Sequence, residues 1–424
     1  MDIVCDIIIR QMTIQSTIQS IRVWGIKGVW DYFANKHKNR RKRQYLLANA
    51  RRYPLVPKRG VTILADMTNK SSLSKAMRDF AFALHKAGIP FQTFDLNPQS
   101  DLPDTDLGKI LTPPKQFRLL KYDHVIEMFS SPLPDLPSLK RAKIVFWEFT
   151  TGLLEYDPSI GKSKTIIAMS DFDRDVFKQI LPKTINIQKI VYPFFFAATG
   201  IPDKKIVRRK YGLPNDAFIV FYNFDYGSSF YRKNPEGCVR AFAAAFVDER
   251  RAMLVFKTKG AAKHVEARSQ LLNLAESLGI GKRMVMIDDY ITQHDIYGLT
   301  EACDVYLSLH RGEGFGLGIA EAMSLGKPVV VTDYSSTTEF CLPHTSMPVA
   351  CSLVKVPNEM HDHPCYHAVQ EWAEPDIKAA AAALRKLYSD PSLRSRIGSA
   401  AKAFLEEHFS IENFRKSVEA FLQQ

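Results

Sequence analysis

Four alternating glycines stand just before a run of helix-forming residues, an arrangement that could hold phosphate. Gly312, Gly314, Gly316 and Gly318 lie between two runs rich in β-branched and other apolar residues. Glycine lets the backbone approach a ligand closely. The helix that follows would offer free N–H groups and the positive end of its dipole. The segment therefore predicts a diphosphate site at the carboxyl end of a strand, where open α/β sheets bind ligands.

Two glutamates accompany these glycines, at positions 313 and 321. A carboxylate at a phosphate site would be repelled, so Glu313 is expected to accept hydrogen bonds from neutral sugar hydroxyls. Glu321, about two turns into the predicted helix, could hold ribose hydroxyls in the same way. Carboxylates that pair with diols, beside a helix end that binds phosphate, describe a site for a nucleotide sugar.

The spacing Glu313-x7-Glu321 resembles the EX7E signature of retaining GT-B glycosyltransferases of family 4. The flanking Glu-Gly-Phe-Gly-Leu and Glu-Ala-Met-x2-Gly-Lys-Pro-Val-Val sequences strengthen the resemblance, which covers residues 60–410. The segment 254–259 is similar to bacterial polysaccharide and lipopolysaccharide members. The resemblance implies further donor-binding positions, namely Gly314, Phe315, Gly316, Leu317, Lys257 and Arg311.

The same resemblance places a basic residue on the donor diphosphate. Within the segment 223–236, Lys233 matches that position best and Arg232 stands beside it. With Glu313 orienting the sugar, these two residues complete the implied catalytic set. Many relatives have a second arginine six residues before the lysine, where this chain has Gly227. Our hypothesis is that Arg311 or Lys257 supplies the missing charge.

The activity that this resemblance implies is transfer of a hexose from a UDP- or GDP-sugar to a glycan or lipid-linked acceptor, with retention of configuration. It implies no metal ion and no cofactor besides the donor substrate. The glycine-rich loop that relatives often carry on the acceptor side is replaced here by Ser71 and Ser72, so the acceptor contacts of that loop are not carried over.

Alternating strand and helix patterns predict an α/β fold with two doubly wound domains. The run 61–65 is β-branched, 73–84 has helical periodicity, and 90–94 is again strand-like, which together form a βαβ unit. The pattern resumes over residues 217–332, after a polar stretch at 197–211 that we expect to connect the domains. We predict an extension at 1–55, a first domain at 56–200, a nucleotide-sugar domain at 201–405 and a terminal helix at 406–424 that crosses back. The resemblance implies the GT-B arrangement, in which two Rossmann-like domains face each other across a cleft.

Length and charge agree with this organisation. A chain of 424 residues exceeds one ordinary core. Of the net charge of +12, the segment 36–59 contributes ten basic residues and no acidic one. The remaining chain is nearly neutral, so a uniformly basic nucleic-acid-binding protein is excluded. Six scattered cysteines without a CxxC pair indicate reduced thiols in the cytoplasm.

The segment 12–59 allows two interpretations. Apolar residues at helical spacing, with Trp24 and Trp30, stand next to the basic run, which is typical of an interfacial anchor on an anionic membrane surface. The other interpretation is a helix packed on its own protein, followed by a solvated charged turn. Under the first, the protein is peripheral on the inner face of the membrane.

Several features resemble other sites but are expected to be structural. Ile319 stands where a GxGxxG motif needs its last glycine, which disfavours an oxidoreductase. The acidic pairs at 104–106 and 171–173 mimic a metal motif, but are interpreted as a loop and a helix start. The histidines and cysteine at 361–367 crowd one loop, unlike a typical zinc site. His124 is interpreted as a core histidine rather than a sugar contact.

Two other functional classes stay open on the sequence. One is a different GT-B enzyme, such as a phosphorylase or a sugar-nucleotide epimerase. The other is a non-catalytic relative that binds sugars or assembles a synthase complex. The intact set of Glu313, Glu321 and Lys233 argues for a working transferase.

Overall fold

The computed structural model describes residues 58–68, 71–95, 121–128, 139–157, 160–194, 201–357, 360, 366 and 369–424. The predicted extension at 1–55, the acidic pair at 104–106 and the histidines and cysteine at 361–367 lie outside the described residues. Within the described part of the chain, we find no helix with the length and apolar character needed to cross a bilayer.

The first domain is a parallel six-stranded sheet in the order β2-β1-β3-β4-β5-β6. Its strands are β1 (Lys58–Ala65), β2 (Phe91–Asp95), β3 (Tyr122–Glu127), β4 (Lys140–Val145), β5 (Thr165–Ala168) and β6 (Asn186–Lys189). Its helices and turn are α3 (Ser72–Lys86), α5 (Leu153–Tyr156), the 3-10 turn η2 (Ile160–Lys162) and α6 (Asp171–Ile180). The last six residues of β1 are all buried, as expected when helices cover both faces of a parallel sheet.

The second domain repeats this design with the strand order β12-β11-β10-β7-β8-β9. Its strands are β7 (Phe218–Asp225), β8 (Ala252–Lys259), β9 (Met284–Ile287), β10 (Val305–Ser308), β11 (Val329–Thr332) and β12 (Met347–Val349). Its helices are α7 (Lys204–Lys210), α8 (Phe230–Lys233), α9 (Pro235–Ala245), α10 (Val265–Ser277), α11 (Gln293–Ala302), α12 (Leu317–Ser324), α13 (Ile377–Ser389) and α14 (Pro391–His408). Its 3-10 turns are η3 (Tyr226–Ser228), η4 (Ala261–Lys263), η5 (Gly281–Arg283) and η6 (Ser335–Glu339). The predicted α/β class with two doubly wound domains is confirmed. An antiparallel hairpin of β13 (Cys351–Lys355) and β14 (Glu371–Pro375) was not predicted.

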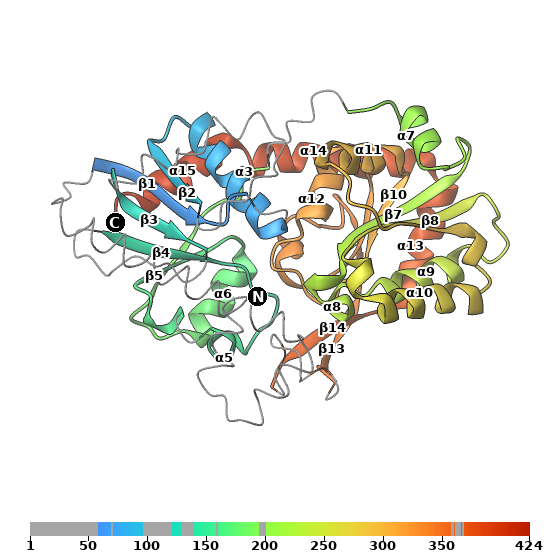
Figure 1. Cartoon of the computed structure of the whole chain (residues 1–424), viewed down its shortest axis with the longest axis horizontal. Helices are drawn as coiled ribbons and strands as arrows, with labels where there is room; N and C mark the ends of the chain where they lie inside the picture. The colour runs from blue at the N-terminus through green and yellow to red at the C-terminus, as the bar shows by residue number, and fades with distance from the viewer. Residues whose placement is uncertain are drawn as a thin grey trace.

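The last helix, α15 (Ile411–Phe421), packs against the first domain although it follows α14 of the second (Figure 1). Phe414 meets Phe80 of α3 edge-on, with ring centroids 5.1 Å apart. Ser417 Oγ accepts a hydrogen bond of 3.2 Å from the backbone N–H of Val191. His124 is buried beneath the same helix, with its ring 5.3 Å from that of Phe421. The structure thus places His124 in the core.

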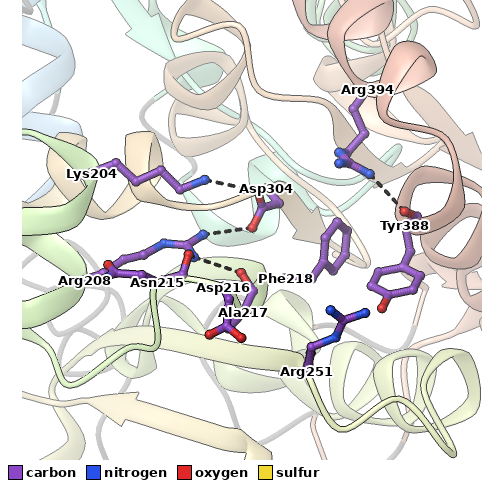
Figure 2. Close-up of a pocket in the computed structure, with 10 residues that line it drawn as sticks. All are labelled: Lys204, Arg208, Asn215, Asp216, Ala217, Phe218, Arg251, Asp304, Tyr388 and Arg394. Carbon is purple, nitrogen blue, oxygen red and sulfur yellow. Dashed lines mark hydrogen bonds and ion pairs between the residues drawn. The ribbon is translucent and has the colours of Figure 1, made fainter.

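The stretch 197–211, expected to connect the two domains, contains a helix from residue 204 onward. Helix α7 occupies this stretch and its Arg208 is buried. The guanidinium donates to the carbonyl oxygens of Ala302 and Ala217 and to the carboxylate of Asp304. Arg208, Ala217 and Asp304 line a hollow of about 340 Å³, and Figure 2 shows them there. This basic stretch lacks apolar periodicity, yet it packs as a helix because backbone carbonyl oxygens accept the hydrogen bonds of the buried Arg208 guanidinium.

Candidate active site

The predicted site lies where the strand order of the second sheet reverses. Strand β7 is the first along the chain, yet β8 lies on one side of it and β10 on the other. The loops after β7 and β10 therefore leave the carboxyl ends of the strands on opposite sides, which is where such sheets usually form their ligand-binding crevice. The loop after β7 carries the short helix α8. The loop after β10 leads into α12.

Three predicted catalytic residues meet between these loops. Lys233 Nζ lies 2.5 Å from Glu313 Oε1, and Arg232 Nη1 lies 3.7 Å from Glu313 Oε2. Two hydrogen bonds hold the Arg232 guanidinium in place. It donates to the carbonyl oxygen of Gly312 at 2.6 Å and to that of Ser228 at 3.0 Å. The side chains of Arg232 and Glu313 are largely buried. The structure thus brings Glu313, Lys233 and Arg232 together at the carboxyl edge of the sheet, with the carboxylate beside both cations.

The surroundings of this cluster shift the pKa values of its side chains. Burial raises the pKa of Glu313, but the positive charges of Lys233 and Arg232 outweigh burial and lower it to about 2. Burial lowers the pKa of Lys233, and the charge of Glu313 opposes that effect. Burial also lowers the pKa of neighbouring His310 to about 4. Near pH 7, Glu313 is an anion and His310 is neutral.

Residues with strained backbone conformations lie beside this cluster. Among the described residues, three non-glycine residues have positive φ: Ser229 at 68°, Asn234 at 48° and Ser335 at 64°. Ser229 and Asn234 flank α8, which carries the two cations. Ser335 Oγ accepts a 2.9 Å hydrogen bond from the backbone N–H of Glu313. Such conformations cost about 1–3 kcal/mol each and concentrate at functional sites.

Ser335 was not foreseen as part of the site. Its only signal in the sequence was a polar turn directly after the buried run of β11, beside the strand that leads to Glu313. Loops at neighbouring carboxyl ends of a parallel sheet meet at one edge, so the turn could have been included on that ground.

Helix α12 begins beside the cluster. Its first residue follows Gly316, whose φ of 88° places it in the left-handed region and whose side chain supplies no cap. A Cβ at Gly316 would lie 2.5 Å from Thr337 Cγ2. The Phe315 ring is buried, and its centroid lies 4.7 Å from that of the Tyr192 ring and 5.2 Å from that of the Phe194 ring. Of the predicted donor-binding residues here, Phe315 can offer only its backbone.

Two of the four glycines lie against the first domain. A Cβ at Gly312 would lie 2.8 Å from the carbonyl oxygen of Glu148, and one at Gly314 would lie 3.0 Å from Cβ of Phe146. Both neighbours belong to the loop after β4 of the first domain. These glycines therefore let the two domains come together directly over the site.

Further contacts join the first domain to the site. Glu148 Oε1 lies 3.2 Å from Arg232 Nη2. Glu339 of the second domain accepts a hydrogen bond of 2.9 Å from the backbone N–H of Asp171 and pairs with Lys189. Ser170 Oγ lies 2.9 Å from Ser336 Oγ. The first domain thus supplies polar groups to both sides of the crevice.

The two residues expected to supply a missing charge each have a protein partner. Arg311 donates to both carboxylate oxygens of Glu374 at 2.7 and 3.1 Å, and stacks on Trp372 of β14 at 5.0 Å. Lys257 donates to the carbonyl oxygen of Thr258 at 2.5 Å. Arg311 also donates to the carbonyl oxygen of Tyr231 on α8 at 2.8 Å, so it lies beside the cluster.

Glu321 contacts the first domain. Its Oε1 lies 3.2 Å from Lys75 Nζ of α3 and accepts a 3.3 Å hydrogen bond from Gln293.

The acidic pair at 171–173 forms the first turn of α6, as interpreted from the sequence, and Asp171 pairs with Arg174 and Lys189. Within the described ranges, no three His, Cys, Asp or Glu side chains are grouped closely enough to hold a metal ion.

Residues 203–346 match the family model of glycosyl transferases group 1. The match covers both loops of the crevice. The serotype-specific mannosyltransferase WbdA of Escherichia coli is 29% identical over 136 residues, which are 31% of this chain and 16% of that protein. The lipopolysaccharide core biosynthesis mannosyltransferase LpsB of Rhizobium meliloti is 33% identical over 76 residues, 18% of this chain and 21% of that protein. The chain thus spans less than a quarter of these curated relatives.

Solved structures extend the likeness of fold to both domains. Sucrose-phosphate synthase of Thermosynechococcus elongatus superposes with a TM-score of 0.60 at 15% identity, covering 86% of this chain and 99% of that one. WaaG, a glycosyltransferase involved in lipopolysaccharide biosynthesis, gives 0.57 at 14% identity, with 85% and 99% coverage. Anabaena HepE, solved in complex with UDP and glucose, gives 0.59 at 15% identity, with 86% and 99% coverage. The fold is therefore that of the GT-B class.

Proposed function

We propose that this chain is a retaining glycosyltransferase of family 4 that moves a hexose from a UDP- or GDP-sugar to a glycan or lipid-linked acceptor. The observation that carries the proposal is the Glu313 carboxylate between Lys233 and Arg232, in the crevice beside α12. The family match over residues 203–346 supports it. The names of the curated relatives favour mannose as the sugar and polysaccharide or lipopolysaccharide synthesis as the process.

The difficult step in such a transfer is the departure of the nucleoside diphosphate. Lys233, Arg232 and the N-terminus of α12 offer fixed positive potential where negative charge develops. Arg232 is already anchored by two carbonyl oxygens, so little reorganisation is needed during the reaction. We therefore propose that these residues stabilise the leaving group and that no metal ion is required.

The carboxylates hold the neutral parts of the donor. Glu313, with its lowered pKa, is an anion at any ordinary assay pH and can accept hydrogen bonds from sugar hydroxyls throughout the reaction. Glu321 would accept those of the ribose. The first domain, which closes over the site through Glu148 and Phe146, would present the acceptor hydroxyl.

We place the protein in the cytoplasm, peripheral on the inner face of the membrane, where a lipid-linked acceptor would be found. The described cysteines are free thiols, as the cytoplasm would keep them. The basic segment 36–59 would meet anionic lipids. Cosedimentation with anionic liposomes at low salt is the measurement that checks this placement, and a protein left entirely in the supernatant would contradict it.

Nucleotide binding tests the proposed function most directly. We expect one of UDP, GDP, ADP, CMP or their sugar conjugates to raise the melting temperature selectively, and Glu321→Ala to abolish the rise. A ligand at 100 times its Kd stabilises a protein by about 2.7 kcal/mol, which thermal shift resolves. The rise is taken relative to each variant without ligand, so that any loss of stability in Glu321→Ala cancels.

The control is Glu407→Ala, which removes an exposed carboxylate of α14 and should leave the nucleotide response unchanged. No rise with any nucleotide, from a folded protein, would contradict the proposal and favour a non-catalytic sugar-binding protein. Release of free nucleotide in step with sugar transfer would separate a transferase from a phosphorylase or an epimerase.

A further inference from the structure

Lys75 connects the two domains at the carboxylate that the proposed function assigns to the ribose. It lies in the first turn of α3 and faces two carboxylates at once. Its Nζ is 2.6 Å from Asp79 Oδ2, one turn further along the same helix, and 3.2 Å from Glu321 Oε1 on α12. The side chains of Lys75 and Glu321 are 16% and 7% exposed. This is an interdomain ion pair largely removed from water.

The surroundings of Glu321 come from three elements. From α3, Lys75 attracts its charge and Asp79 repels it. From α11, Gln293 donates to its Oε1 at 3.3 Å, and Tyr297 hydrogen-bonds to it. From the loop after β6, the hydroxyl of Tyr192 donates to Asp79 at 2.9 Å.

We propose that Lys75 is a positioning residue of the ribose site, which keeps the Glu321 carboxylate ionised and oriented toward the ribose hydroxyls when the domains are closed. This inference rests on the proposed function, because it takes Glu321 as the ribose acceptor. A carboxylate has about four acceptor positions. Lys75, Gln293 and Tyr297 each donate to this carboxylate, which leaves acceptor capacity for a ribose hydroxyl.

The lysine is needed because two carboxylates converge on it. Burial raises the pKa of Glu321, and Lys75 lowers it. Without Lys75, no lysine would stand between Asp79 and Glu321, and the negative charge of Asp79 would favour uptake of a proton by Glu321. A protonated Glu321 would offer the ribose fewer acceptor positions.

Because Lys75 belongs to the first domain, nucleotide binding is coupled to closure of the two domains. A donor-site residue of the second domain is completed by a cation that reaches it only when the domains are apposed as they are here. A nucleotide that needs the ionised carboxylate will therefore favour the closed form over a more open one.

The test is the affinity for UDP and GDP, measured by calorimetry from pH 6 to pH 9 on Lys75→Met and Lys75→Arg. Loss of one buried charge partner shifts a pKa by about 1–3 units. We therefore expect Lys75→Met to bind the nucleotide about tenfold more weakly at pH 6.5, with the loss shrinking as pH rises and Glu321 is deprotonated. Lys75→Arg should restore affinity. Lys86→Met, at the exposed end of the same helix, is the matched control.

A second variant shifts the profile in the opposite direction. Asp79 raises the pKa of Glu321, so Asp79→Asn should extend nucleotide binding to lower pH. This prediction holds even where Lys75→Met folds poorly. A Lys75→Met profile equal to the wild type, or a loss that is uniform across pH and not rescued by arginine, would overturn the inference alone. A wild-type protein that binds no nucleotide would overturn the proposed function, and this inference with it.

Discussion

Glu313→Gln is expected to reduce kcat for sugar transfer by about a thousandfold, while the KM for the donor stays the same or falls. Preorganised electrostatic groups contribute on the order of 10²–10³ to kcat each. Here the loss should lie at the upper end, because the carboxylate both contacts the sugar and balances two cations at 2.5 and 3.7 Å. Without it, Lys233 and Arg232 keep their attraction for the diphosphate, so ground-state binding is not weakened. Initial rates of nucleotide release at varied donor concentration separate the two constants.

The control for this variant is Glu407→Gln, an isosteric change at an exposed position of α14. It should leave both constants at wild-type values. A Glu313→Gln protein that keeps a tenth or more of kcat would show that the carboxylate is not part of the reacting site. An equal loss of kcat and of folded protein, seen by circular dichroism, would assign Glu313 a structural role instead.

Lys233→Met is expected to lower kcat/KM for the donor by about 10²–10³, with part of the loss appearing as weaker nucleotide binding. The ammonium is the cation closest to Glu313, and Arg232 cannot move to replace it because two carbonyl oxygens hold its guanidinium. Its loss also leaves Glu313 less well balanced, so a carboxylate would repel the incoming diphosphate. Steady-state kinetics and thermal shift with the same nucleotide measure both effects.

Lys402→Met serves as the matched control, since Lys402 lies on α14 with its side chain 53% exposed. We expect it to behave as the wild type. If Lys233→Met bound the nucleotide with unchanged affinity and retained its kcat, the diphosphate would have to lie elsewhere in the crevice. The opposite effects of the two variants on donor binding make the pair more informative than either alone. Glu313→Gln leaves two cations without their carboxylate, whereas Lys233→Met leaves Glu313 with Arg232 as the remaining cation of the cluster.

The amino-acid sequence determined the fold class and the centre of the site. Short buried runs such as those of β10 and β11, separated by helical periodicity, can form only the inner strands of a covered parallel sheet. The chain order of those strands then brings the loop that carries Lys233 next to the loop that carries Glu313. Local rules also fixed the helix starts, as at Ser170, whose hydroxyl caps α6. These features depend on neighbours within a few residues, and on the geometry common to all such sheets.

Tertiary structure alone decided which groups each long polar side chain meets. Arg311 stands two residues from Glu313 in the sequence, yet its guanidinium donates to the carboxylate of Glu374. Glu374 belongs to a hairpin that the local sequence pattern did not predict. Arg208 is buried and donates to the carboxylate of Asp304, and Glu321 of the second domain pairs with Lys75 of the first. The glycines at 312 and 314 likewise accommodate the first domain. A flexible charged side chain selects among partners by distance and desolvation, and both exist only once the two domains have packed together.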